Sequence, residues 1–167
     1  MASNVRNRLL LLGVLWGLGL AVVPALVMTD PYQLTGLLVA ALVCAALSGA
    51  VGTLAAGLRV ARKGGRSGFL AGIGTGVFQG LVGGGAAALL FWALMALTIS
   101  GFTLRNPVDI SVLMSPRVFL GSFFVALSAF LYAFAGGLLL GPVFGRLINR
   151  AVRAHSGAEG KENLVVR

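Results

Sequence analysis

Apolar residues along this chain stand in long continuous blocks and do not alternate with polar ones. Four blocks without a charged residue are separated by short polar segments, and they cover residues 9–29, 31–58, 67–104 and 118–145. A helix needs about 20 apolar residues to cross the hydrocarbon core of a bilayer, and each block is longer than that. The pattern therefore predicts an all-α membrane protein, a bundle of four transmembrane helices.

The blocks and the segments between them predict a single four-helix transmembrane domain over residues 1–155. Residues 98–116 are expected to form an outer loop, and the polar residues 156–167 a disordered cytoplasmic tail. From the capping signals and the charges that flank each block, the membrane spans are expected at about 5–28, 31–61, 67–97 and 117–148.

The composition agrees with this interpretation, because 10% of the residues are charged, whereas a soluble domain carries about 25%. The net charge of +9 would indicate a nucleic-acid partner in a soluble protein. Here the charges instead report topology: of the 13 Lys and Arg residues, all except Arg105 and Arg117 lie at the two termini or between the second and third blocks. The positive-inside bias then places both termini in the cytoplasm. We expect no nucleic-acid partner.

The abundance of alanine, glycine and arginine favours a multi-pass protein of a bacterial plasma (inner) membrane. Basic residues that flank the spans attract anionic lipid head groups, each contributing about 1 kcal/mol near the surface. The bilayer is therefore an expected partner, and the residues predicted to contact its head groups are Arg59, Arg62, Lys63, Arg66, Arg146, Arg150 and Arg153.

Small residues recur at every fourth position in all four blocks, which is the pattern of a glycine zipper. Close approach of two backbones drives helix association in lipid, and only small side chains permit it. We expect the second and third helices to form a closely packed antiparallel hairpin. Packing within the chain and packing against another subunit both remain open. The predicted packing residues are Gly68, Gly72, Gly76, Gly80 and Gly84, with Gly49 and Gly52.

Glycine rows on four spans resemble, at the level of pattern, those of a group of protein translocases. The basic and acidic signature expected beside the glycine motif of that group is missing, so the resemblance implies no function for this chain.

The four apolar blocks contain no Asp, Glu, Lys, Arg or His, the residues that mark proton relays, ion paths and metal sites in membranes. The single cysteine, Cys44, and the single histidine, His155, complete no metal-binding spacing. No P-loop, nucleophile elbow or pair of carboxylates is present. The sequence predicts no catalytic residue, no cofactor and no metal, and hence a protein that is not an enzyme.

One group of polar residues stands out at depth in the spans: Gln79, Ser48 and Tyr132. At the rise of a helix, all three lie roughly 16–21 Å from the basic flanks, near the bilayer midplane. We expect Gln79 to hydrogen-bond to Ser48, to Tyr132 or to a carbonyl beside Gly49. Contact of Gln79 with a bound solute is the alternative.

Two functions from different classes follow. The first is a structural or accessory subunit of a larger membrane complex, or a scaffold that associates with itself. The second is a small transporter or channel component for a neutral or hydrophobic solute. The second requires a cavity lined by polar residues of the spans such as Gln79, Ser48, Tyr132, Ser128 or Thr75.

Overall fold

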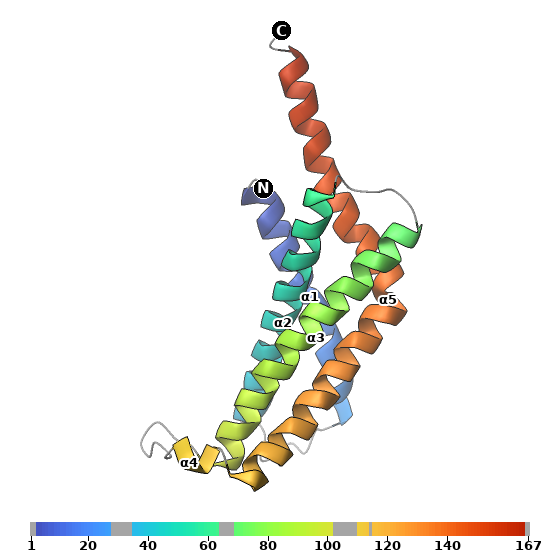
Figure 1. Cartoon of the computed structure of the whole chain (residues 1–167). Helices are drawn as coiled ribbons and strands as arrows, with labels where there is room; N and C mark the ends of the chain where they lie inside the picture. Colours follow the sequence, from blue (N-terminus) through green and yellow to red (C-terminus); the bar gives the residue numbers. More distant parts are fainter. Residues whose placement is uncertain (1–2, 28–34, 64–68, 102–109, 114, 166–167) are drawn as a thin grey trace.

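The computed structural model describes residues 3–27, 35–63, 69–101, 110–113 and 115–165. Over these ranges the chain folds into helices and has no strand. The helices are α1 (Ser3–Val27), α2 (Thr35–Arg62), α3 (Phe69–Ile99), α4 (Ile110–Leu113) and α5 (Pro116–Val165) (Figure 1).

Four of these helices are long and apolar enough to cross a membrane. The qualifying segments are Ser3–Val22 in α1, Leu37–Arg62 in α2, Phe69–Ile99 in α3 and Pro116–Ala154 in α5. The four blocks of the sequence therefore correspond to four candidate spans, and the architecture is that of a multi-pass helical membrane protein.

Prolines do not end the helices in which they occur. Helix α1 continues past Pro24 to Val27, and α5 continues through Pro142. A proline inside a transmembrane helix is tolerated because neighbouring helices and local adjustments satisfy the freed backbone groups. Gly68, a predicted packing residue, and Arg66, a predicted head-group residue, lie outside the described residues.

Helix α5 is longer than the sequence indicates. Its backbone is helical to Val165, whereas the fourth span was expected to end near 148 and residues 156–167 were expected to be disordered. Alanine, glutamate and lysine in this segment are good helix formers, which favours continuation of the helix.

The helices pack in the order α1, α2, α3, α5, each against the next. The most extensive contact is between α3 and α5, while α1 meets α5 over a much smaller surface. Helices α2 and α3 do pack together as an antiparallel pair, but the closest partner of α3 is α5 (Figure 1). The chain thus forms two helix pairs, α1 with α2 and α3 with α5, joined through the contact of α2 with α3.

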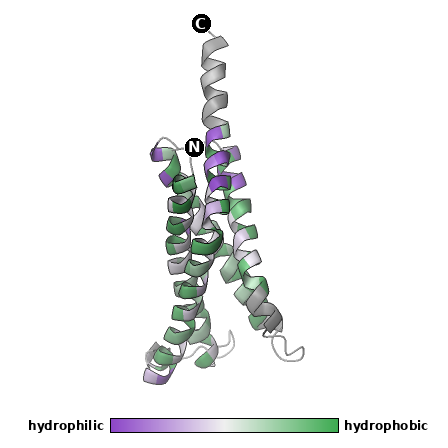
Figure 2. Cartoon of the chain, turned by 90° about the vertical axis from the view of Figure 1, so that its right-hand side faces the viewer, coloured by the Kyte–Doolittle hydropathy of each residue, from purple (hydrophilic) through white to green (hydrophobic). Residues whose placement is uncertain are grey.

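The core lies at the end of the bundle where the chain begins and where hydrophilic residues gather (Figure 2). We call this the basic end. Trp16 packs against the core and stacks on Phe144, with 4.3 Å between ring centroids. The buried core residues are Val5 and Leu9 of α1, Ala56 and Val60 of α2, and Phe144, Ile148 and Val152 of α5.

Glycines of α3 and α5 meet in an antiparallel series. A Cβ atom added at Gly76 would collide with the backbone of Gly141. A Cβ added at Gly137 would lie 2.7 Å from the Cα of Gly80. A step of four residues forward along α3, from Gly76 to Gly80, corresponds to a step of four residues backward along α5, from Gly141 to Gly137. Successive turns of the two helices therefore repeat the same close approach. Gly72 and Gly84 face α5 in the same way, against Pro142 and Phe130.

Helix α2 offers a different row of small residues to each of its neighbours. Gly49 faces α1, where an added Cβ would collide with the backbone of Gly13. Gly52 faces α3, where an added Cβ would lie 2.8 Å from both the backbone carbonyl oxygen of Gln79 and the Cα of Gly83. One helix therefore approaches the backbones of both α1 and α3.

Candidate functional site: a cavity between the four long helices

A cavity of about 500 Å³ lies between the two helix pairs, and all four long helices line it. We call it the central cavity. Its lining residues fall between Trp16 and Ala21 in α1, Leu38 and Gly49 in α2, Gln79 and Phe91 in α3, and Val125 and Ala133 in α5. Small-molecule sites in proteins measure about 300–1,000 Å³ and are mostly apolar, and the central cavity has both properties.

The packing of the helices explains why the cavity forms where it does. At the basic end the core cluster joins α1, α2 and α5, and the Trp16–Phe144 stack continues it. Farther from the basic end, 11 of the 21 residues that line the cavity are alanine or glycine, and each of the four helices contributes at least two of them. Figure 2 shows the two arms of the molecule separating in this direction. Small side chains on arms that diverge leave space between the helix pairs.

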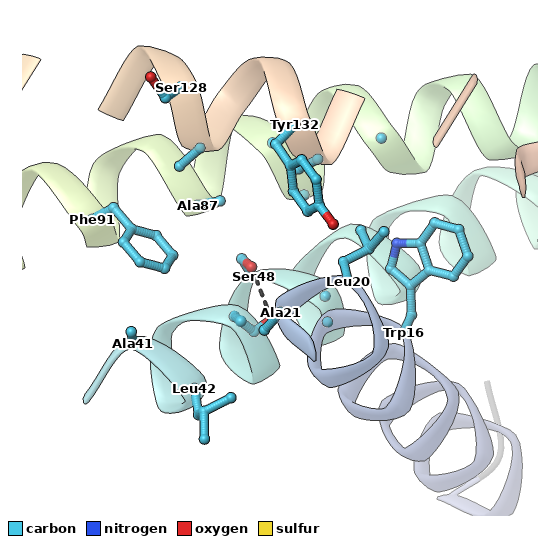
Figure 3. A pocket seen from close by; sticks show the side chains of 18 of the residues that line it. Trp16, Leu20, Ala21, Ala41, Leu42, Ser48, Ala87, Phe91, Ser128 and Tyr132 are labelled. Carbon is cyan, nitrogen blue, oxygen red and sulfur yellow. Dashed lines mark hydrogen bonds between the residues drawn. The ribbon is translucent and has the colours of Figure 1, made fainter. Parts of the chain in front are cut away.

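The structure brings the predicted polar residues Ser48, Gln79 and Tyr132 together at this cavity, with Ser128 beside them. Figure 3 shows the Tyr132 ring reaching from α5 toward Leu20 and Trp16 of α1. Of the residues named for a solute site, Thr75 is the one that does not line the central cavity. The number of residues that separate Ser48, Gln79 and Tyr132 from the basic flanks is enough to predict that these three lie at a similar depth in the membrane.

The two serine hydroxyls are satisfied within their own helices. Ser48 Oγ donates to the Ala45 carbonyl oxygen at 2.9 Å, the bond drawn in Figure 3. Ser128 Oγ donates to the Phe124 carbonyl oxygen at 2.9 Å. Each hydroxyl oxygen still has lone pairs with which to accept a bond from a bound molecule.

Gln79 differs from the serines, because its side chain is 1% exposed and its Oε1 has no hydrogen-bond partner among the described residues. The expected hydrogen bond from Gln79 to Ser48 or Tyr132 is not formed in this structure. A buried polar atom without a partner costs about 1–3 kcal/mol. Native structures retain few such atoms, and each calls for an explanation.

Thr53 of α2 is a second orphan that sequence reasoning missed. It is fully buried and its Oγ1 has no partner in the described part of the chain. Thr53 stands in a row of small residues spaced four apart on α2, which consists of Ala41, Ala45, Gly49, Thr53 and Gly57. The signal available in the sequence was a polar residue in a row made otherwise of alanine and glycine.

The predicted head-group residues gather at the basic end but have different surroundings. The Arg59 guanidinium lies over the Phe78 ring at 4.3 Å, and the Arg146 guanidinium lies over the Phe69 ring at 4.9 Å. Arg62 and Arg150 are exposed, and Arg153 has a buried Nε without a partner. Arg59 and Lys63 line a second, smaller pocket between α2, α3 and α5.

No family model matches the chain, and no curated protein or solved structure matches it either. Within the described residues no group of three or more His, Cys, Asp or Glu side chains is placed to hold a metal ion. The expectations of no cofactor and no catalytic residue stay predictions.

Proposed function

We propose that the protein is a non-catalytic integral membrane protein that holds a neutral, mainly apolar molecule in its central cavity, as a small transporter or channel component does. One observation carries the proposal: the buried and unpartnered Gln79 Oε1 belongs to a residue that lines a large apolar cavity. A bound molecule with a hydrogen-bond donor would fill the space, and it would satisfy that oxygen once the Gln79 side chain turned its Oε1, which is buried in this structure, toward the cavity.

The lining selects against charged molecules. Among the described residues it contains no Asp, Glu, Lys, Arg or His, and burying a charge without a counter-charge is very costly. A carboxamide oxygen accepts hydrogen bonds, so the preferred ligand carries a hydroxyl or amide donor on an apolar body.

Quenching of Trp16 by a brominated lipid tests the proposal, because Trp16 lines the central cavity and Trp92 is the only other tryptophan. In a Trp92→Phe background, we expect a dibrominated monoacylglycerol to quench Trp16 fluorescence in a saturable manner. Ala21→Phe places a large ring in the cavity and is expected to abolish saturable quenching. Val22→Phe makes a comparable change at the next position, where the native side chain is 50% exposed, and is the matched control.

Equal quenching in the two variants would place the lipid on the outer surface of the bundle and refute the cavity as its site. Loss of quenching in Ala21→Phe alone supports the proposal.

A structural or accessory subunit is the second candidate, and an aromatic surface at the far end from the basic end favours it. Trp92 and Phe119 pack edge to face at 6.5 Å, and Phe119 stacks on Phe123 at 6.4 Å. Phe119, Phe123 and Phe124 are 46%, 46% and 63% exposed. Aromatic side chains are enriched at interfaces, so this surface suits a partner subunit or a second copy. Mass measurement after purification in mild detergent tests it: a stoichiometric complex supports this candidate, and a lone monomer contradicts it.

We also propose that the close backbone approaches of α1 with α2 and α3 with α5 are glycine-zipper packing. The support is that added Cβ atoms at several glycines would meet backbone rather than movable side-chain ends. The proposed setting is a bacterial inner membrane with both termini in the cytoplasm, supported by the distribution of the 13 basic residues.

A further inference from the structure

A second pocket, of about 260 Å³, lies at the basic end between α2, α3 and α5. We call it the basic pocket. Its described lining includes two cations, Arg59 and Lys63, and no carboxylate. Like charges brought together without a counter-charge repel each other, so the arrangement is stabilised by an anion.

One of the two cations, Arg59, is held in place by an aromatic ring of α3. The guanidinium of Arg59 lies over the Phe78 ring at 4.3 Å, a cation–π contact that restricts its position. Lys63 directly follows the last residue of α2, and its backbone N–H donates to the Arg59 carbonyl oxygen at 3.1 Å, so one further turn of the backbone brings it beside Arg59.

Two polar residues deepen the pocket. Thr75 Oγ1 lies 2.8 Å from the Ala71 carbonyl oxygen and 3.3 Å from Asn149 Oδ1, and these two acceptors share its one proton. Because Asn149 Oδ1 accepts from Thr75, the Asn149 amide nitrogen is left as the donor of that side chain. Asn149 is 6% exposed, so this donor is held in the fold and does not project freely into solvent.

The remaining wall is apolar and determines which anion fits. Ala56 and Val60 of α2 and Phe78 of α3 line the pocket on the side that continues into the spans. A free phosphate ion has no apolar surface to pack against these residues. The glycerol and the first methylene groups of a phospholipid would cover them. Basic pockets between transmembrane helices are typical sites for anionic lipid head groups.

We infer that the basic pocket binds the phosphate head group of one anionic phospholipid. Arg59 and Lys63 contact the phosphate, Asn149 donates to it, and the acyl chains leave over Phe78 toward the bilayer. The site is separate from the central cavity and does not depend on what that cavity holds.

Native mass spectrometry of delipidated protein titrated with dioleoylphosphatidylglycerol tests the inference. We expect the double variant Arg59→Gln, Lys63→Gln to weaken binding by about tenfold or more, since each contact with an anionic head group is worth about 1 kcal/mol. The matched control is Arg62→Gln, Arg150→Gln, which removes the same charge from residues that are equally exposed at the same end and do not line the basic pocket. We expect less than a threefold change in the control.

A second pair of variants leaves the charge unaltered. Gly74 lines the basic pocket, and an added Cβ there would meet nothing within 4 Å, so Gly74→Val narrows the pocket without a clash. Gly85 is equally unobstructed on the same helix and lies outside the pocket, so Gly85→Val is its control. We expect the first variant to lose phosphatidylglycerol and the second to retain it.

Three results would overturn the inference. Equal losses in the pocket and control variants would show attraction by the basic surface as a whole. Equal affinity of the unmodified protein for dioleoylphosphatidylcholine would show that the pocket does not select an anion. Displacement of phosphatidylglycerol by inorganic phosphate at equal concentration would assign the site to a free phosphate.

Discussion

At the scale of single residues, the central feature of this protein is one carboxamide. Gln79 is buried at the contact of α2 with α3, where its backbone carbonyl oxygen, not the side-chain oxygen, faces Gly52. Gln79 is one of the residues that line the central cavity, and its buried Oε1 lacks a hydrogen-bond partner among the described residues. The sequence singled out Gln79 because it is a polar residue in the middle of an apolar span. Whether its carboxamide finds a hydrogen-bond partner depends on how the side chains of α2 and α3 are arranged. The spacing of residues along the sequence does not determine that arrangement.

Replacement of Gln79 by leucine separates a structural amide from a ligand-binding one. We expect Gln79→Leu to unfold at the same temperature as the delipidated parent protein or higher, because it removes an orphan oxygen costing about 1–3 kcal/mol. Added 1-oleoylglycerol should raise the unfolding temperature of the parent more than that of the variant. Methyl oleate, which has no donor, should affect both alike. A marked loss of stability in the delipidated variant would mean that Gln79 has a structural partner and would refute its role as a ligand anchor.

At the scale of helices, the spans were predictable but their partners were not. Block length and hydropathy define the four long helices, because a bilayer requires continuous apolar segments of about 20 residues. All four carry fourfold rows of small residues, so the rows do not specify which helix meets which. The row of Gly72, Gly76 and Gly80 faces α5 and not α2.

The polar residues of the central cavity illustrate the same limit. Counting residues from the basic flanks placed Ser48, Gln79 and Tyr132 at one depth, and depth survives any rotation of the helices. The stacking of Trp16 on Phe144 and the pairing of Thr75 with Asn149 depend on rotation and crossing, and neither was visible in the sequence.

The contact of α3 with α5 gives a prediction at this scale. In Gly76→Ile the new side chain meets the backbone of Gly141, which has no rotamer with which to move aside. Overpacking of this kind costs about 1–3 kcal/mol or more. We expect a large drop in thermal unfolding temperature in detergent. Gly85→Ile, on the same helix with no atom within 4 Å of an added Cβ, should unfold close to the parent temperature. Equal stability of the two variants would contradict glycine-zipper packing.

At the scale of the whole molecule, most of the positive charge and the packed core lie at the same end of the bundle. The core cluster, the basic pocket and most of the basic residues lie at one end, and the central cavity lies between the arms that diverge from it. Tight packing near the basic flanks and looser packing farther away produce a bundle that is closed at one end and hollow beyond it.

The gathering of basic residues at one end predicts which end of the bundle lies on the cytoplasmic side of the membrane. In a Cys44→Ala background, we expect a membrane-impermeant maleimide to label Ser111→Cys of α4 in intact cells. Ser3→Cys, at the start of α1, should react only after the membrane is permeabilised, because the proposed orientation places the basic end in the cytoplasm. Both native serines are exposed, so access to the reagent is not limited by burial. The reverse pattern of labelling would contradict the orientation.

An experimental density map of the protein in lipid nanodiscs tests the central claim most directly, which is that a neutral, mainly apolar molecule occupies the cavity between the two helix pairs. We predict elongated density among Trp16, Ala87 and Tyr132, with one end within hydrogen-bonding distance of Gln79. The same density should be missing from Ala21→Phe. A cavity that holds water alone, or helix pairs that close upon each other and leave no space, would contradict the account.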